Sequence, residues 1–183
     1  MRSVLISIRP KWCQKIMSGE KTIEVRKTRP KLNPPFKCYI YCTKDTKTQF
    51  WTGPRYSYTD NHSHNAFDKC GNSKVIGEFV CDDIFERIVQ IGTSCEKPKY
   101  CLCDWNMECT PLDGILSGAC LTLEELEKYL NGGVGYGWHI SDLRIYDRPM
   151  DLHEFASIKV LRDGFELRLL ERPPQSWCNV VRA

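Results

Sequence analysis

The segment Gly19–Arg26 has four ionisable side chains, and three of them, Lys21, Glu24 and Arg26, could form one charged site. If a strand begins at Thr22, Glu24 and Arg26 share one face of it, because side chains alternate along a strand, and Lys21 lies at its start. The carboxylate then neutralises a neighbouring cation, so neither cation is buried unpaired. This set predicts a charged binding cleft or, as the alternative, an ion pair that braces the strand.

The chemistry available to such a cleft is recognition of a polar, anionic ligand. The planar fork of Arg26 suits a phosphate or a carbonyl edge, and Lys21 adds a point charge. Glu24 can accept a hydrogen bond from an exocyclic amine or position a water as a general base. Six further side chains are candidate ligands: Ser7, Arg9, Trp12, Trp138, His139 and Ser141. Trp12 offers a ring edge for stacking against a base, and packing is the alternative role for both tryptophans and for His139.

Short strands with two helices are expected to position these residues. Alternating apolar residues predict strands in segments 3–9, 22–27, 36–43, 74–91, 138–147 and 173–181, and a hairpin about Asp163–Gly164. Pro10 opens a helix that ends at Ser18, and a capping box of Thr122 and Glu125 opens a helix that runs to Leu130. Six to eight strands with two helices predict an α+β, mainly β fold, a small β-barrel with peripheral helices.

Two segments, 44–73 and 92–120, carry no sustained pattern and are expected as insertions in a single domain spanning residues 1–183. The long strand before the second insertion is expected to bend at Gly77 or near Asp82–Asp83. The first insertion interleaves aromatic and basic residues: Trp51, Arg55, Tyr56, Tyr58, His62 and His64. Such a loop suits single-stranded nucleic acid, through stacking and phosphate contacts, or simply covers one end of the barrel.

Composition indicates a globular protein of the cytoplasm. The net charge of +3 permits an anionic partner, and a protein that coats nucleic acid would be more basic. No apolar run approaches the length of a membrane span, and we expect no export signal. The eleven cysteines are therefore expected to be mostly thiols.

A zinc site is the alternative to free thiols, because several possible ligands follow one another: His62, His64, Cys70, Cys95, Cys101, Cys103 and Cys109. The chain has no C-x-x-C pair, which structural zinc sites use most often. In a strand, Cys101 and Cys103 are expected to hold their sulfurs apart. The interpretation is small buried thiols, with no metal and no cofactor.

The order strand, short helix and "SGEKTIEVR" resembles the ASCH family of the PUA-like superfamily, in the branch found in phage and bacterial genomes. The family signature, G-x-K-x-x-E-x-R, is complete in Gly19, Lys21, Glu24 and Arg26. The phrases "LISIRPKWCQKI", "VIGEFVCDDI", "GYGWHISDLRIYDRP" and "RPPQSWC" support the resemblance. It implies a PUA-like barrel with a cleft beside the first helix, in which RNA, single-stranded nucleic acid or a nucleotide binds.

One small branch of that family resembles amidohydrolases acting on acetylated cytidine, with the motif lysine and a threonine nucleophile. The chain departs from this pattern, because Glu24 stands at the position of the threonine; Thr22, two residues away, is a weak substitute. The main hypothesis is thus an RNA- or nucleotide-binding module. The alternative is a metal-free hydrolase, a ribonuclease or an acetylcytidine amidohydrolase-like enzyme, with Glu24 as base and Lys21 or Arg26 stabilising negative charge.

Overall fold

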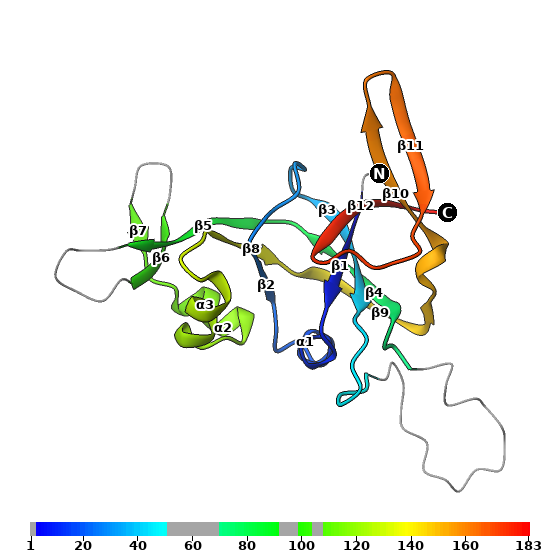
Figure 1. The fold of residues 1–183 in the computed structure, drawn as a ribbon. Helices are drawn as coiled ribbons and strands as arrows, with labels where there is room; N and C mark the ends of the chain where they lie inside the picture. The colour runs from blue at the N-terminus through cyan, green and yellow to red at the C-terminus, as the bar shows by residue number, and fades with distance from the viewer. Residues whose placement is uncertain (1–2, 51–69, 92–98, 104–107) are drawn as a thin grey trace, which may run out of the picture.

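The computed structural model describes residues 3–50, 70–91, 99–103 and 108–183, and these residues are organised mainly as β-strands (Figure 1). The first sheet has the order β11 (Gly164–Leu169), β10 (Phe155–Leu161), β12 (Trp177–Arg182), β1 (Ser3–Ile8), β3 (Phe36–Cys42), β4 (Lys74–Cys81), β9 (Ser141–Met150). The second has the order β2 (Ile23–Arg26), β8 (Gly135–His139), β5 (Ile84–Ile91), β6 (Lys99–Cys103), β7 (Cys109–Thr110). The helices are α1 (Pro10–Met17), α2 (Asp113–Ala119) and α3 (Leu123–Leu130), with a 3₁₀ turn η2 (Leu152–Glu154).

Two long strand pairs pass from one sheet to the other. β4 continues into β5 across Asp82–Asp83, as the sequence predicted, and β8 continues into β9 across Ile140. Backbone hydrogen bonds hold both corners: His139 N donates to the Asp83 carbonyl at 3.0 Å, and Ile140 N donates to the Thr22 carbonyl at 2.8 Å. The α+β, mainly β class is confirmed. The described strands form two open sheets, so the predicted closure into a barrel is not confirmed.

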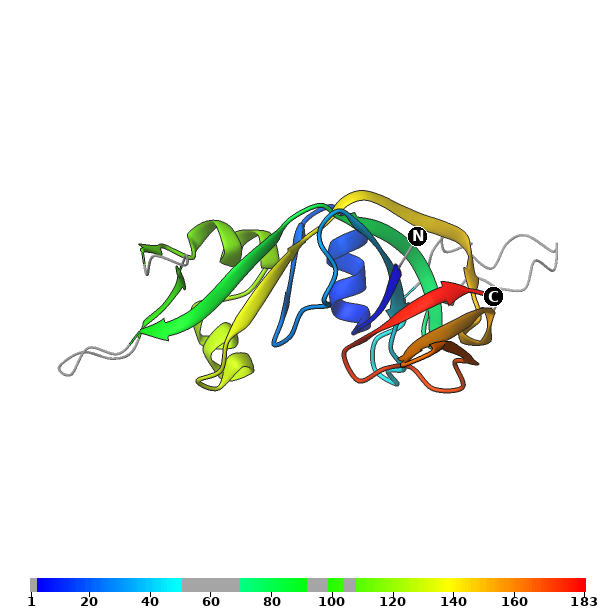
Figure 2. The same cartoon turned by 90° about the horizontal axis from the view of Figure 1, so that it is seen from above.

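Helix α1 lies at the middle of the molecule, between the second sheet with its helices and the β10–β12 end of the first sheet (Figure 2). It begins at Pro10, where the missing N–H costs no hydrogen bond, and it buries Cys13 and Ile16 against the core beneath β1 and β3. Gly19 follows with a φ of +78°, a left-handed conformation that glycine adopts without strain and that turns the chain toward β2.

Helices α2 and α3 cover the second sheet through a separate apolar cluster that includes Ile23, Ile88, Ile115 and Leu126. The predicted capping box of α3 is confirmed: Glu125 N donates to Thr122 Oγ1 at 3.1 Å, and Thr122 N donates to Glu125 Oε2 at 3.0 Å. Helices α2 and α3 are therefore packed beside β2, the strand that carries Glu24 and Arg26 of the charged motif.

The segment Cys95–Cys120, expected to be irregular, contains β6, β7 and α2 among its described residues. Helix α2 has only seven residues, and two of them, Gly114 and Gly118, disfavour a helix in isolation. Gly118 is needed for a close approach, because a Cβ there would lie 2.8 Å from Ile23 Cδ1 and 2.9 Å from Thr22 Oγ1. Packing against β2 therefore stabilises a helix that the local sequence does not favour.

The loop predicted to bind nucleic acid, with Trp51, Arg55, Tyr56, Tyr58, His62 and His64, lies outside the described residues. Its described start ends in the fully buried Phe50, whose N–H donates to Asn72 Oδ1 at 2.7 Å. The predicted hairpin about Asp163–Gly164 is confirmed as β10–β11, and it extends away from the rest of the molecule (Figure 1). No described helix combines the length and the apolar character that a membrane crossing requires.

Candidate ligand-binding cavity

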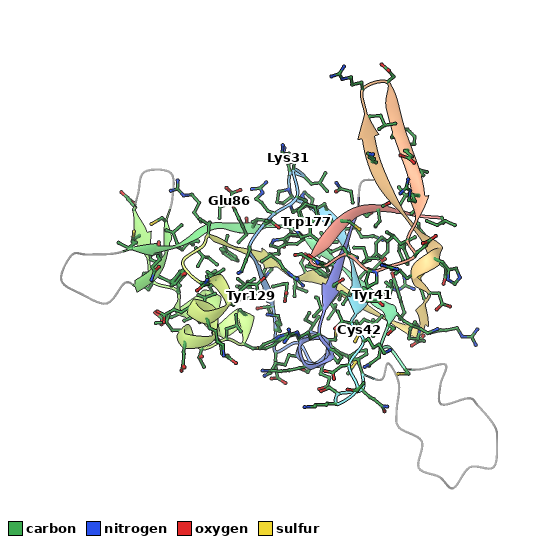
Figure 3. The ribbon with its side chains drawn as sticks, viewed as in Figure 1. Lys31, Tyr41, Cys42, Glu86, Tyr129 and Trp177 are labelled. Atoms are coloured by element: carbon green, nitrogen blue, oxygen red, sulfur yellow. The ribbon has the colours of Figure 1, made fainter. Side chains whose placement is uncertain are left out.

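A cavity of about 630 Å³ opens between α1, β2, α3 and the segment that precedes β12. Its lining combines charged, aromatic and proline residues: Ser7, Ile8, Arg9, Trp12, Lys21, Glu24, Val25, Arg26, Thr43, Leu121, Glu125, Tyr129, Pro173, Pro174, Gln175 and Ser176. The structure thus brings together the three motif residues with Ser7, Arg9 and Trp12. Tyr129 of α3, labelled in Figure 3, joins them from the second sheet's side.

Lys21 is 3% exposed, and its ammonium is surrounded by acceptors. Nζ donates to the carbonyl oxygens of Ile23 and Ala119, each at 2.8 Å, and lies 3.3 Å from Glu24 Oε2. Two of the three ammonium hydrogens therefore go to backbone carbonyls, and Glu24 adds an electrostatic contact. Lys21 is therefore an anchor between β2 and the end of α2 rather than the mobile point charge that the sequence suggested.

Glu24 lies between the two cations and is 7% exposed. Its Oε1 is 3.0 Å from Arg26 Nε, and its Oε2 is 3.3 Å from Lys21 Nζ. Oε2 and Arg26 Nε make no hydrogen bond of good angular geometry, so these contacts are primarily electrostatic. Any proton abstraction by Glu24 would have to compete with two ion pairs, which favours a positioning and accepting role.

Arg26 is 8% exposed and donates from Nη2 to the Ser7 carbonyl at 2.6 Å. Nε lies 3.0 Å from Glu24 Oε1 as an ion-pair contact, so one of the five N–H donors, on Nη2, has a hydrogen-bond partner within the described chain. Ser7 is itself held in place, because its Oγ donates to the Pro174 carbonyl at 2.7 Å. The guanidinium is thus fixed in orientation at the cavity wall and retains N–H groups for a ligand.

Two aromatic rings edge the cavity from opposite elements. Trp12 of α1 is half-buried, and Lys21 Nζ lies 5.1 Å from its ring centroid. Tyr129 of α3 is 40% exposed, and Lys27 Nζ lies 5.3 Å from its ring. Burial raises the pKa of the Tyr129 phenol, so it stays protonated and can donate at neutral pH. Rings of this kind suit stacking against a planar base.

The charge of the lining is modest. Three cations, Arg9, Lys21 and Arg26, face two carboxylates, Glu24 and Glu125, for a net charge of +1. Since Lys21 and Glu24 satisfy one another, the cations left for a ligand are Arg26 at the wall and Arg9, which is exposed. The cavity can therefore bind one anionic group beside a planar, hydrogen-bonding moiety.

Four predicted site residues do not line the cavity. Trp138 is fully buried in the core, and its ring centroid lies 6.1 Å from that of Trp177, which is labelled in Figure 3. Trp138 Nε1 has no hydrogen-bond partner within the described residues. Ser141 Oγ donates to the Val80 carbonyl at 2.9 Å. Thr22 is exposed, lies against Gly118 and is absent from the cavity lining. The strand predicted to begin at Thr22 begins one residue later, at Ile23.

His139, the fourth of these residues, is at the corner between β8 and β9. Its Nδ1 lies 2.7 Å from Asp82 Oδ1, and this hydrogen bond lowers the pKa of the Asp82 carboxyl. The pair joins the two strand corners described above. Its position indicates a structural contact between the corners.

The sequence missed the segment Pro173–Ser176 and Tyr129 as parts of the lining. Pro174 and Ser176 are brought to β1 by backbone contacts, including Ser7 N donating to the Ser176 carbonyl at 2.9 Å. The two prolines before the final strand were a signal of an extended segment. Tyr129 carried no comparable signal, because its helix position reads equally well as surface.

Most of the described cysteines behave as packing residues. Burial raises the pKa of the Cys13, Cys38 and Cys81 thiols, to about 12 for Cys81, so they are neutral near pH 7. Among the cysteines that the structure describes, none forms a disulfide.

Three cysteines differ from these. Cys101, Cys103 and Cys109 place their sulfurs within 4.8 Å of one another. The expectation that Cys101 and Cys103 would hold their sulfurs apart is wrong, because both point to the same face of β6 with Sγ atoms 3.3 Å apart.

Comparison with solved structures identifies the fold. The crystal structure of ASCH from Zymomonas mobilis matches with a TM-score of 0.51 and 18% sequence identity, over 96% of this chain and 85% of that one. Crystal structures of two mutant proteins of the same ASCH match over 96% of this chain, each with a TM-score of 0.50, at 18% and 19% identity. No protein-family model and no curated protein matches the chain.

Proposed function

Because the chain has the ASCH-domain fold, we propose that it is an RNA- or nucleotide-binding module whose cavity takes one phosphate-bearing nucleotide, free or within a single strand. The observation that carries this proposal is Arg26, a guanidinium fixed by Glu24 and Ser7 with N–H groups left for a ligand. A planar fork of this kind binds a phosphate through two parallel hydrogen bonds. Trp12 and Tyr129 would contact the base, and Glu24 Oε2 would accept from an exocyclic amine.

Binding is favoured over catalysis by the arrangement of the groups that a hydrolase would use. Thr22 does not line the cavity, and the Lys21 ammonium donates to two backbone carbonyls and pairs with the Glu24 carboxylate. Glu24 would have to leave an ion pair in order to act as a base. The metal-free hydrolase, ribonuclease or amidohydrolase-like, is the second candidate; its strongest support is the enclosed carboxylate in the cavity.

Several finer assignments belong to the same proposal. The chain is a single PUA-like domain over residues 1–183 with insertions at 44–73 and 92–120, from the phage and bacterial branch, acting in the cytoplasm. The two sheets that share bent strands are compatible with an opened barrel of this type. The partners are RNA, single-stranded nucleic acid or a nucleotide, with no membrane and no cofactor required at the cavity.

The test separates binding from turnover. Purified protein is incubated with nucleoside monophosphates, modified nucleosides including acetylated cytidine, and short single-stranded RNAs. Binding is followed by tryptophan fluorescence and products by mass spectrometry. We expect binding with no product, weakened at least about tenfold by Arg26→Ala, because a hydrogen bond to a charged group contributes about 1.5–3 kcal/mol. Turnover that Glu24→Gln abolishes without loss of binding would replace this proposal with the hydrolase.

A further inference from the structure

The sulfur cluster at the end of the second sheet consists of Cys101, Cys103 and Cys109. Two rules of sheet geometry bring these side chains together. Cys101 and Cys103 are two residues apart in β6 and therefore share a face, and Cys109 of β7 is the direct cross-strand partner of Cys103. The resulting Sγ separations are 3.3 Å for Cys101–Cys103 and 2.9 Å for Cys103–Cys109.

From this geometry we propose that Cys101, Cys103 and Cys109 bind a zinc ion that fastens the end of the second sheet. A tetrahedral zinc with Zn–S bonds of about 2.3 Å has neighbouring sulfurs about 3.8 Å apart. The three sulfurs of the cluster, all within 4.8 Å of one another, need only small side-chain rotations to reach that spacing. Thiolate ligands of this number and softness select zinc over magnesium or calcium.

The burial of the cluster fits a structural rather than a catalytic ion. Cys103 is 1% exposed, Cys101 is half-buried and Cys109 is exposed, so the ion is covered on one side by the sheet. On binding, three thiols release three protons to solvent and three Zn–S bonds form, which leaves one position of the tetrahedron for a fourth ligand.

The location explains what the ion would stabilise. Strand β7 has only two residues and lies at the edge of the second sheet, where it pairs with β6 alone, so few backbone hydrogen bonds hold it. The chain then enters α2, whose last residue, Ala119, accepts the hydrogen bond from Lys21. A zinc ion that joins β6 to β7 would fix the start of α2 and so support the cavity wall from outside.

The proposal is tested on the full chain by metal analysis and by cobalt substitution. We expect about one zinc per chain after purification without chelator, and an intense thiolate-to-cobalt charge-transfer band when Co²⁺ replaces it. Cys101→Ser, Cys103→Ser and Cys109→Ser should each weaken zinc binding at least about tenfold, since even indirect support of a metal ligand contributes that much. Cys178→Ser, which removes a half-buried thiol of β12, should leave it unchanged.

Each opposing outcome is distinct. A Cys103–Cys109 disulfide in protein prepared with reductant, seen as a loss of two hydrogens in the intact mass, would overturn the proposal. Zinc that is absent from the reduced protein and produces no cobalt band, or that is lost equally in Cys178→Ser, would also overturn it. Retention of full zinc affinity in all three cluster variants would place the ion elsewhere in the chain. None of these outcomes bears on ligand binding in the cavity, which is measured separately.

Discussion

The Lys21 ammonium donates a 2.8 Å hydrogen bond to the backbone carbonyl of Ala119, the last residue of α2. This contact joins residues 98 positions apart in the chain and ties the charged motif to the helix that covers it. The motif therefore has two roles: Lys21 and Glu24 connect β2 to α2, and Arg26 presents its remaining N–H groups to a ligand in the cavity.

Replacement of Lys21 by Met should destabilise the protein by about 3–5 kcal/mol, because it leaves the Glu24 carboxylate buried without one of its two cations. The matched control is Lys15→Met, since Lys15 pairs with Glu20 on the helix surface and such pairs contribute less than about 1 kcal/mol. The free energy of unfolding in urea measures both. Equal losses in the two variants would show that the Lys21 contacts are not stabilising.

The two glycines of α2 provide a paired test of its contact with β2. Gly114→Ala should be neutral or stabilising by up to about 1 kcal/mol, because the added Cβ would enter open space and alanine favours a helix. Gly118→Ala should destabilise by about 1–3 kcal/mol, because its Cβ would overlap Ile23 and Thr22. Thermal unfolding of both variants gives the comparison, and a stabilising Gly118→Ala would mean that α2 is not packed so closely on β2.

Glu78 makes stability depend on pH. Burial alone would raise the pKa of Glu78, but hydrogen bonds from Tyr146 at 2.7 Å and Lys37 at 2.9 Å outweigh it and hold that pKa below its ordinary value. A lowered folded-state pKa means that the contribution is complete above the unfolded pKa of about 4.3 and is lost as the pH falls through the folded value.

The corresponding experiment compares wild type with Glu78→Gln. We expect a loss of about 1–2 kcal/mol near neutral pH, where the carboxylate accepts both hydrogen bonds. The difference should narrow as the pH falls below the unfolded pKa of about 4.3 and the wild-type carboxyl becomes protonated. Thermal unfolding midpoints over a pH series from neutral to acidic measure this, with Glu166→Gln in an exposed pair as control. A difference that is constant with pH would contradict the assigned hydrogen bonds.

Tyr129 tests the aromatic edge of the cavity with a control at the same position. Tyr129→Leu should weaken binding of a nucleotide by roughly five- to a hundredfold, because stacking contributes about 1–3 kcal/mol per base. Tyr129→Phe keeps the ring and should retain most of the affinity. Since Tyr129 is 40% exposed on α3, both variants should fold normally. Indistinguishable affinities for Leu and Phe would remove Tyr129 from the binding site.

Much of the architecture was predictable because its signals are local. The capping box of α3, the helix at Pro10 and the turn of the β10–β11 hairpin depend on residues close together in sequence. The clustering of Lys21, Glu24 and Arg26 was also predictable, since alternation puts Glu24 and Arg26 on one face of β2 and Lys21 directly precedes that strand.

The rest depended on contacts between distant segments. The hydrogen-bond acceptor of Lys21, Ala119, lies in α2. The sequence did not predict this helix, because its two glycines disfavour helix formation. Trp138 was expected at the cavity, but the core beneath β1 and β3 fully buries it. The cysteine cluster required the register of β6 against β7, which places Cys109 opposite Cys103 and which no spacing rule encodes.

Binding in the cavity is tested by the affinity of Arg26 variants for a short single-stranded RNA and for a nucleoside monophosphate. Fluorescence anisotropy and calorimetry measure this affinity at several salt concentrations. Arg26→Ala and Arg26→Lys should both weaken binding, because an ammonium cannot reproduce the guanidinium fork, and Arg168→Ala on the exposed hairpin should not. For RNA, one phosphate bound by Arg26, or two if Arg9 also contributes, predicts a log–log salt slope of about 0.7 to 1.4. Equal losses in Arg26→Lys and Arg168→Ala would mean diffuse surface attraction and would contradict binding in the cavity.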